Sequence, residues 1–205
     1  YIGGLDKTRG ISLSQMLSRD SRNRAEFPTS GSRFHIENTY SGGVLGGNEN
    51  FQKHILDLQW FTPTFSKVIL YNSFKLGVIK TLDVDDDVKS FVPFDERFIM
   101  GGNGIPYGNA LRGYPDNSIG PQTASGQAVG GNSMGRVTTE LRFPLSENPV
   151  IYVMAFGEMG NVWNSSKMSE PFYIDRNGPL SMKKSAGVGV RFFMPGIGKL
   201  GFDMG

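Results

Sequence analysis

The chain has 205 residues, including 28 Gly, 15 Phe, 7 Tyr and 11 Pro, and it has no Cys. This composition is typical of a turn-rich β protein, and the lack of Cys excludes disulfides and zinc–thiolate sites. With 21 basic and 19 acidic residues the net charge is +2, which gives no electrostatic reason to expect nucleic acid as a partner. No stretch approaches the roughly 20 consecutive apolar residues of a membrane-spanning helix.

The first half of the chain contains stretches in which apolar and polar residues alternate. Leu13 and Leu17, for example, share one face, and Ser14 and Ser18 share the other. A period of two is that of a β-strand whose faces meet different media. Alternation of this kind predicts strands at residues 11–20, 33–40, 53–60 and 67–76.

The second half contains further stretches of the same kind. Their polar faces carry charges of both signs, as Glu140 and Arg142 show between Leu141 and Phe143. One stretch, at 150–158, is apolar on both faces, so its alternation does not say which residues share the polar face. The strands predicted here are residues 136–143, 150–158, 185–192 and 199–204.

The connections alternate in length. Short turns at 62–66, 146–149 and 195–198 are separated by longer links. This pattern predicts up-and-down strands with tight turns at one rim and loops at the other, as in outer-membrane barrels. The twelve-residue link at 21–32 is the exception on the short side. Aromatic residues near strand ends, namely Tyr40, Trp60 and Phe61, predict an interfacial girdle.

Alternation by itself leaves two fold classes open. In a soluble β-sandwich the polar faces point outward, whereas in a transmembrane barrel they line a wet lumen. The connection lengths favour the barrel. Because the chain starts and stops within its pattern, we expect about eight strands of a larger antiparallel barrel, truncated at both ends. Residues 1–205 then form part of one domain, with a long loop at 78–133.

This loop has neither helical nor strand periodicity, although it spans about fifty residues, and such long ordered loops are usually functional. Near its middle, Arg112 lies between Leu111 and the pair Gly113-Tyr114. Gly113 allows the backbone to turn tightly, and Tyr114 can pack or form a hydrogen bond. The arrangement indicates a loop tip shaped to place one guanidinium.

Several motifs together resemble the BamA family of outer-membrane assembly factors. LRGY at 111–114 resembles its (V/L)RG(F/Y) loop tip, flanked by FDERFIMGGN at 94–103 and GGNSMGRVTTELRFPL at 130–145. FGEMGNVW at 156–163 resembles a family strand end, with Glu158 replacing the usual Asp. RDSRNRAEFPTSGSRF at 19–34 resembles a periplasmic turn of the family, which accounts for the long link at 21–32.

The resemblance implies a sixteen-stranded barrel whose loop enters the lumen, where its arginine meets acidic groups on the inner wall. In this sequence Glu140 and Glu158 are candidates, because their strands are joined by a short turn and pair. A planar guanidinium with five donors suits two carboxylates. We therefore expect Arg112, Glu140 and Glu158 to form an ion pair that anchors the loop, with Leu111, Gly113 and Tyr114 shaping its tip.

The resemblance also implies a function. It predicts an integral protein of the bacterial outer membrane that folds and inserts other β-barrel proteins, without catalysis and without a cofactor. Its partners would be membrane lipids, unfolded outer-membrane clients and the lipoproteins of an assembly complex. The alternative is a protein-translocating pore of the same superfamily, TamA-like or of the two-partner secretion type. A simple porin or receptor barrel is a third possibility.

Metal sites and nucleophilic catalysis find little support. The acidic run from Asp83 to Asp87 lacks the Gly and Glu spacing of a calcium-binding EF loop, and a solvated loop is the expected reading. Two histidines, His35 and His54, leave little for a metal centre or a catalytic triad. No metal is predicted.

Overall fold

The computed structural model describes residues 9–47, 49–82, 92–104, 108–164, 173–174, 181–194 and 196–205. The acidic run at 83–87 lies outside these residues. Two short 3₁₀ turns are present, η1 at Gly43–Leu45 and η2 at Phe94–Glu96. Within the described residues, no helix has the length and apolar character required to cross a membrane. The long strands are β1 Ser12–Asp20, β2 Gly31–Ser41, β3 Phe51–Pro63, β4 Ile69–Thr81, β6 Ser133–Glu147, β7 Val150–Trp163, β9 Lys183–Met194 and β10 Gly198–Met204.

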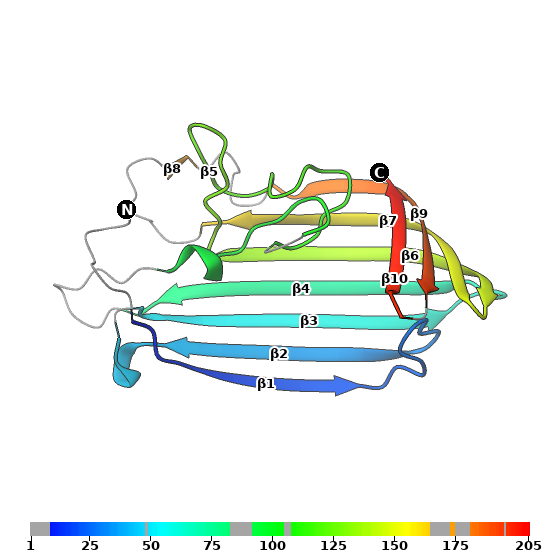
Figure 1. The fold of residues 1–205 in the computed structure, drawn as a ribbon, viewed down its shortest axis with the longest axis horizontal. Coiled ribbons are helices and arrows are strands. Elements are labelled where there is room, and N and C mark those ends of the chain that lie inside the picture. The colour runs from blue at the N-terminus through cyan, green and yellow to red at the C-terminus, as the bar shows by residue number, and fades with distance from the viewer. Residues whose placement is uncertain are drawn as a thin grey trace.

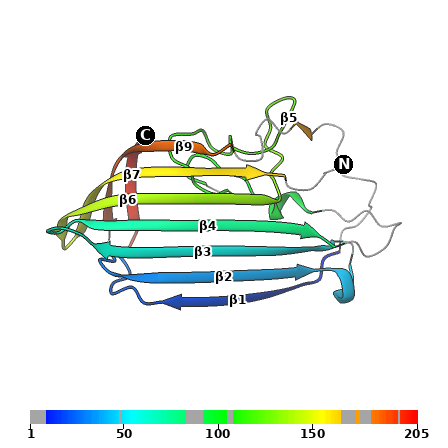
Figure 2. The ribbon, with the colours of Figure 1, turned by 180° about the vertical axis from the view of Figure 1, so that it is seen from behind.

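These long strands form one antiparallel sheet in the order β1-β2-β3-β4-β6-β7-β9-β10. Figures 1 and 2 show β1, β2, β3, β4, β6 and β7 side by side, with the hairpin β9–β10 curling away at one end. Each predicted strand is present, and several are longer than predicted. Two further strands, β5 Gln122–Thr123 and β8 Tyr173–Ile174, pair separately. In the part of the chain described, the edge strands β1 and β10 do not pair with each other, so the sheet is not closed, as expected of part of a larger barrel.

The sheet exposes its apolar face and covers its polar face. On β6, Leu141 and Phe143 are 48% and 42% exposed, whereas Thr138, Glu140 and Arg142 are buried. A water-soluble protein has the opposite distribution, because charged side chains lose hydration when they are buried. The soluble β-sandwich is therefore excluded. The predicted transmembrane barrel fits, with apolar side chains facing lipid and polar ones facing the interior.

The aromatic girdle is only partly as predicted. Tyr40 and Trp60 are exposed on the outer face. Phe61 is buried on the inner face, with its ring centroid 4.9 Å from that of Tyr71. The prediction for Phe61 was wrong because neighbouring strand residues point to opposite faces, so Trp60 and Phe61 cannot both face lipid.

The interior also contains two apolar clusters, so the expectation of a wet, charged lumen was incomplete. The loop cluster joins residues of the long loop to the inner wall, and the turn cluster lies toward the short turns. The loop cluster consists of Phe51, Ile79, Val92, Phe98, Met100, Leu111, Ile119, Met134 and Val162. The turn cluster consists of Phe27, Phe61, Ile69, Tyr71, Tyr152, Met154 and Phe156.

Glycines on the inner wall give the loop room to pack. A Cβ at Gly77 of β4 would lie 2.5 Å from Cζ of Phe98. A Cβ at Gly160 of β7 would lie 2.9 Å from Sδ of Met100. Glycine within a strand often marks such a close approach. The wall is thus shaped to receive two bulky loop side chains, and this packing places the loop tip.

Candidate functional site

The loop tip is held against the wall by its backbone and by one fully buried side chain. Leu111 is 0% exposed and belongs to the loop cluster. Its N–H donates to the carbonyl of Gly102 at 3.2 Å, and Nη1 of Arg136 on β6 donates to the carbonyl of Ala110 at 2.8 Å. The next residue, Arg112, is therefore fixed from both its own loop and the sheet.

Arg112 contacts both carboxylates that were singled out from the sequence. Its Nη2 lies 2.6 Å from Oε1 of Glu140 and 2.6 Å from Oε1 of Glu158. Its backbone N–H donates to Oε2 of Glu158 at 2.9 Å. The three side chains are 10%, 7% and 3% exposed, so the contact is largely shielded from water. Charge-assisted hydrogen bonds of this kind are about twice as strong as neutral ones.

The register of the sheet explains how both carboxylates reach one cation. Glu140 on β6 pairs with Phe156 on β7, and Thr138 pairs with Glu158. The two carboxylates are thus diagonal neighbours on one face of adjacent strands, within reach of a single guanidinium. Oγ1 of Thr138 donates to Oε1 of Glu158 at 3.2 Å and steadies it.

Aromatic rings complete the seat, and sequence reasoning did not find them. The guanidinium carbon of Arg112 lies 3.8 Å from the ring centroid of Phe156, which is cation–π geometry. The alternation of β7 was ambiguous because its inner face carries Tyr152, Met154 and Phe156 as well as Glu158. The turn cluster therefore forms the floor of the site.

A second arginine, also missed, binds the other side of Glu140. Nε and Nη2 of Arg142 lie 2.8 and 2.7 Å from Oε2 of Glu140. Its guanidinium carbon is 4.0 Å from the ring centroid of Tyr71. Arg142 is two residues after Glu140 on the same strand, so the strand period was the signal that could have identified it.

A third carboxylate, Asp203 on β10, extends the network to the last hairpin. Its Oδ1 is 3.7 Å from Nη1 of Arg112, and its Oδ2 is 2.7 Å from Nη2 of Arg191 on β9. Among the ion-paired groups, three guanidinium groups thus face three carboxylates, so the charges of these six groups balance. Balanced charge is what allows so many ionic groups to be buried together.

Gly113 and Tyr114 contact the same hairpin. Gly113 has φ +81°, and a Cβ added there would lie 3.4 Å from atoms of Ser185 and Gly205. The hydroxyl of Tyr114 donates to the carbonyl of Lys184 at 2.8 Å. Together, Arg112, Gly113 and Tyr114 connect the loop to β6, β7, β9 and β10.

The surroundings of Arg112 keep its side chain charged. Burial acts to lower the pKa of Arg112, but hydrogen bonds and charge attraction from Glu158 and Glu140 outweigh it and raise that pKa above its usual value. The guanidinium therefore stays charged at every physiological pH. Over the residues that the structure describes, no group of three or more His, Cys, Asp or Glu is placed to hold a metal ion.

Comparison with known proteins agrees with the resemblance of the motifs. Residues 3–205 match the Omp85 superfamily domain. The outer membrane protein assembly factor BamA of Nitratidesulfovibrio vulgaris (strain Hildenborough) is 28% identical over 190 residues, which are 92% of this chain and 22% of that protein. The crystal structure of BamA from Haemophilus ducreyi lacking POTRA domains 1–3 has a TM-score of 0.74 at 25% identity, over 94% of this chain and 38% of that one.

The chain therefore spans about a fifth of the length of this curated relative and under two fifths of the solved one. Both are named as BamA, and the curated name describes an assembly factor rather than an enzyme. The translocating pore that was the alternative prediction is not favoured by these names.

Proposed function

Because the chain belongs to the Omp85 superfamily, we propose that it is part of a barrel that folds and inserts β-barrel proteins into the bacterial outer membrane. Like its relatives, the chain is an outer-membrane β-barrel protein. The activity comes from the name of the BamA relative, "outer membrane protein assembly factor". On this proposal its partners are membrane lipids, unfolded outer-membrane proteins and the lipoproteins of an assembly complex.

The proposed mechanism is non-enzymatic. An assembly barrel can template an incoming strand by offering unpaired backbone N–H and C=O groups at a strand edge. Such templating needs a barrel of defined shape and no catalytic residue or cofactor. The contribution of this region is then to supply the wall and to hold the long loop inside it.

The observation that carries the role proposed for this region is the contact of Arg112 with Glu140 and Glu158 at 2.6 Å each. We assign it the role of a clamp that keeps the loop in the lumen and the barrel in its working conformation. A buried pair suits this role because the loss of one partner leaves the other charge without compensation, at a cost of about 3–5 kcal/mol. Leu111, Gly113 and Tyr114 shape the clamp by setting the position of the tip.

Complementation tests this role. Cells depleted of the wild-type full-length protein would express the Arg112→Glu variant, and the amounts of folded client barrels in their outer membranes would be measured. We expect a strong loss of clients, because the reversed charge faces two carboxylates. Arg112→Lys should show an intermediate loss, since an ammonium lacks the planar fork.

The matched control is Lys80→Glu, which makes the same charge reversal at an exposed position of β4. This variant should retain wild-type client levels. Wild-type client levels in Arg112→Glu cells, with the variant present at normal abundance, would contradict the clamp. Loss of clients in the control as well would show that the assay reports charge in general.

A further inference from the structure

The link between β1 and β2, residues 21–30, forms a preorganised turn at the short-turn rim. Asn23 organises it: Nδ2 donates to Oγ1 of Thr29 at 2.6 Å, and Oδ1 accepts from the N–H groups of Thr29 and Ser30 at 3.0 and 3.2 Å. The N–H of Ser21 donates to the carbonyl of Ser32 at 2.8 Å. The turn therefore behaves as one shaped unit rather than as a loose loop.

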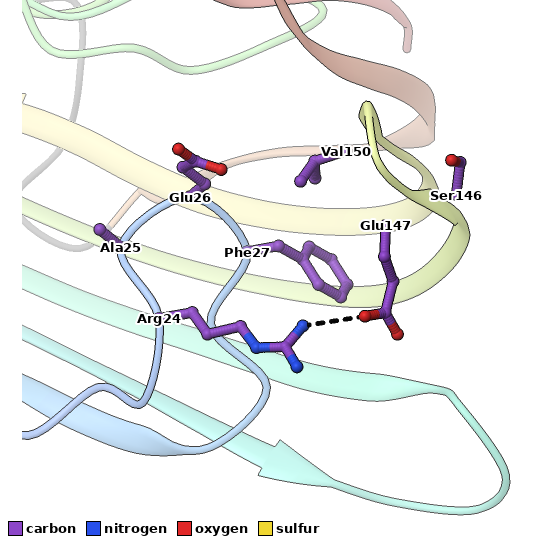
Figure 3. A pocket seen from close by; sticks show the side chains of 7 residues that line it. All are labelled: Arg24, Ala25, Glu26, Phe27, Ser146, Glu147 and Val150. Carbon is purple, nitrogen blue, oxygen red and sulfur yellow. Dashed lines mark hydrogen bonds and ion pairs between the residues drawn. The ribbon is translucent and has the colours of Figure 1, made fainter.

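This turn reaches across the inner face of the sheet. Its Phe27 is 5% exposed and belongs to the turn cluster, with its ring centroid 4.8 Å from that of Tyr152 on β7. Three strands, β3, β4 and β6, lie between β2 and β7 in the sheet order. Phe27 thus passes over the ends of these strands to reach the far wall, and Figure 3 shows the turn lying over the ribbon of the sheet.

The turn also makes an ionic contact with the hairpin between β6 and β7. Nη1 of Arg24 lies 3.2 Å from Oε2 of Glu147, and these side chains are 56% and 69% exposed. A cleft of about 250 Å³ remains between the turn and the hairpin. Figure 3 shows its lining residues, which are Arg24, Ala25, Glu26, Phe27, Ser146, Glu147 and Val150.

This cleft means that the turn is not packed solidly against the hairpin. Its contacts with β7 and with the β6–β7 hairpin include one buried ring and one exposed ion pair. A unit that is rigid inside and is held by separable side-chain contacts can move as a body while the strands stay paired.

We propose that residues 21–30 form a strap that closes the lumen at the short-turn rim, with Phe27 as its plug and Arg24–Glu147 as its latch. The closed strap blocks hydrated ions, because an apolar constriction excludes water and so removes the path along which ions move. The plug also adjoins the loop clamp, since Tyr152 and Phe156, on which Phe27 and Arg112 rest, share the inner face of β7. The inference does not depend on the proposed assembly function.

Ion conductance tests the plug. Full-length protein would be reconstituted in planar lipid bilayers in potassium chloride, and the open fraction of single channels would be compared between wild type and Phe27→Ala. Truncating a buried Phe should raise the ratio of open to closed strap roughly a hundred- to several-thousandfold. The matched control is Phe65→Ala, which removes a 71% exposed ring from the neighbouring turn and should leave conductance unchanged.

A charge swap tests the Arg24–Glu147 latch. Both side chains are exposed, so their substitution should not prevent folding, and any change in conductance then reports on the latch. Arg24→Glu and Glu147→Arg should each raise the open fraction roughly two- to fivefold, the range for an exposed pair. The double swap should restore the wild-type value. Lys67→Glu, an exposed charge reversal in the turn between β3 and β4, should have no effect.

Wild-type conductance in a folded Phe27→Ala protein would overturn the plug, and equal effects of Phe27→Ala and Phe65→Ala would overturn it too. Should Phe27→Ala not fold, the swap decides: single variants without an effect, or a double swap that does not restore closure, would overturn the strap. Folding would be checked by heat-modifiable mobility on gels.

Discussion

The loop and the turn each attach to this barrel wall through an Arg–Glu contact, and the two contacts differ in burial. In the loop, Arg112 meets Glu140 and Glu158 with side chains at most 10% exposed. At the turn, Arg24 and Glu147 are both more than half exposed. An exposed ion pair contributes only about 0–1 kcal/mol to stability, because water screens it. Breaking a buried pair leaves a charge without a partner away from water, which costs more. On our two proposals, the same residue types therefore form a clamp for the loop and a latch for the turn.

The loop also packs more apolar side chains against the wall than the turn does. The loop contributes Val92, Phe98, Met100, Leu111 and Ile119 to its cluster, all at most 5% exposed. The turn contributes only Phe27 to the other cluster. Each buried apolar side chain adds about 1.5–3 kcal/mol before entropy is counted. The loop is thus part of the wall, and the turn is an attachment to it.

The largest effect is expected for Arg112→Ala. It leaves Glu158 and part of Glu140 without their cation, and we expect a loss of about 3–5 kcal/mol in the free energy of unfolding. Urea unfolding in lipid vesicles, followed by the fluorescence of Trp60 and Trp163, measures it. A loss below that of Arg24→Ala would contradict the comparison between the two contacts.

Leu111→Ala tests the apolar contacts by which the loop cluster holds the loop against the wall. Truncation of a fully buried Leu should lower the free energy of unfolding by about 2–5 kcal/mol, because a cavity remains next to a rigid wall. The same unfolding assay applies, with Leu145→Ala as the control, since Leu145 is 58% exposed on the outer face. Equal losses in the two variants would show that the loop cluster is not a true core.

Gly77→Ala should have an intermediate effect. Its Cβ would collide with the ring of Phe98, and overpacking of this kind costs about 1–3 kcal/mol. A second change, Phe98→Leu, should relieve the clash and recover part of the stability. If the double variant lost more free energy of unfolding than the two single variants together, Phe98 would not be packed against Gly77.

Arg24→Ala should have the smallest effect, a loss of about 0–1 kcal/mol that diminishes further in high salt because the pair is solvated. The midpoint of heat-modifiable mobility at low and high salt measures it. Arg112→Ala should show little salt dependence by comparison. A strong salt dependence for Arg112 would mean that water enters the clamp.

The sequence alone determined the strands, the faces of all of them except residues 150–158, and the clamp candidates. A two-residue period separates residues such as Leu141 and Phe143 from Glu140 and Arg142 without any knowledge of the tertiary structure. The motif around Arg112 and the short turn between β6 and β7 made Glu140 and Glu158 candidates. Local pattern sufficed because a strand's faces depend only on neighbouring residues.

The tertiary structure decided what lies opposite each face. Several contacts of the inner face join residues from different parts of the chain. They are the packing of Phe61 against Tyr71, of Arg112 against Phe156 and of Phe27 against Tyr152, and the ion pair of Asp203 with Arg112. Period two says that a side chain points inward, but not what it meets there. That depends on the curvature of the sheet and on how the loop and the turn fold over it, which no local pattern encodes.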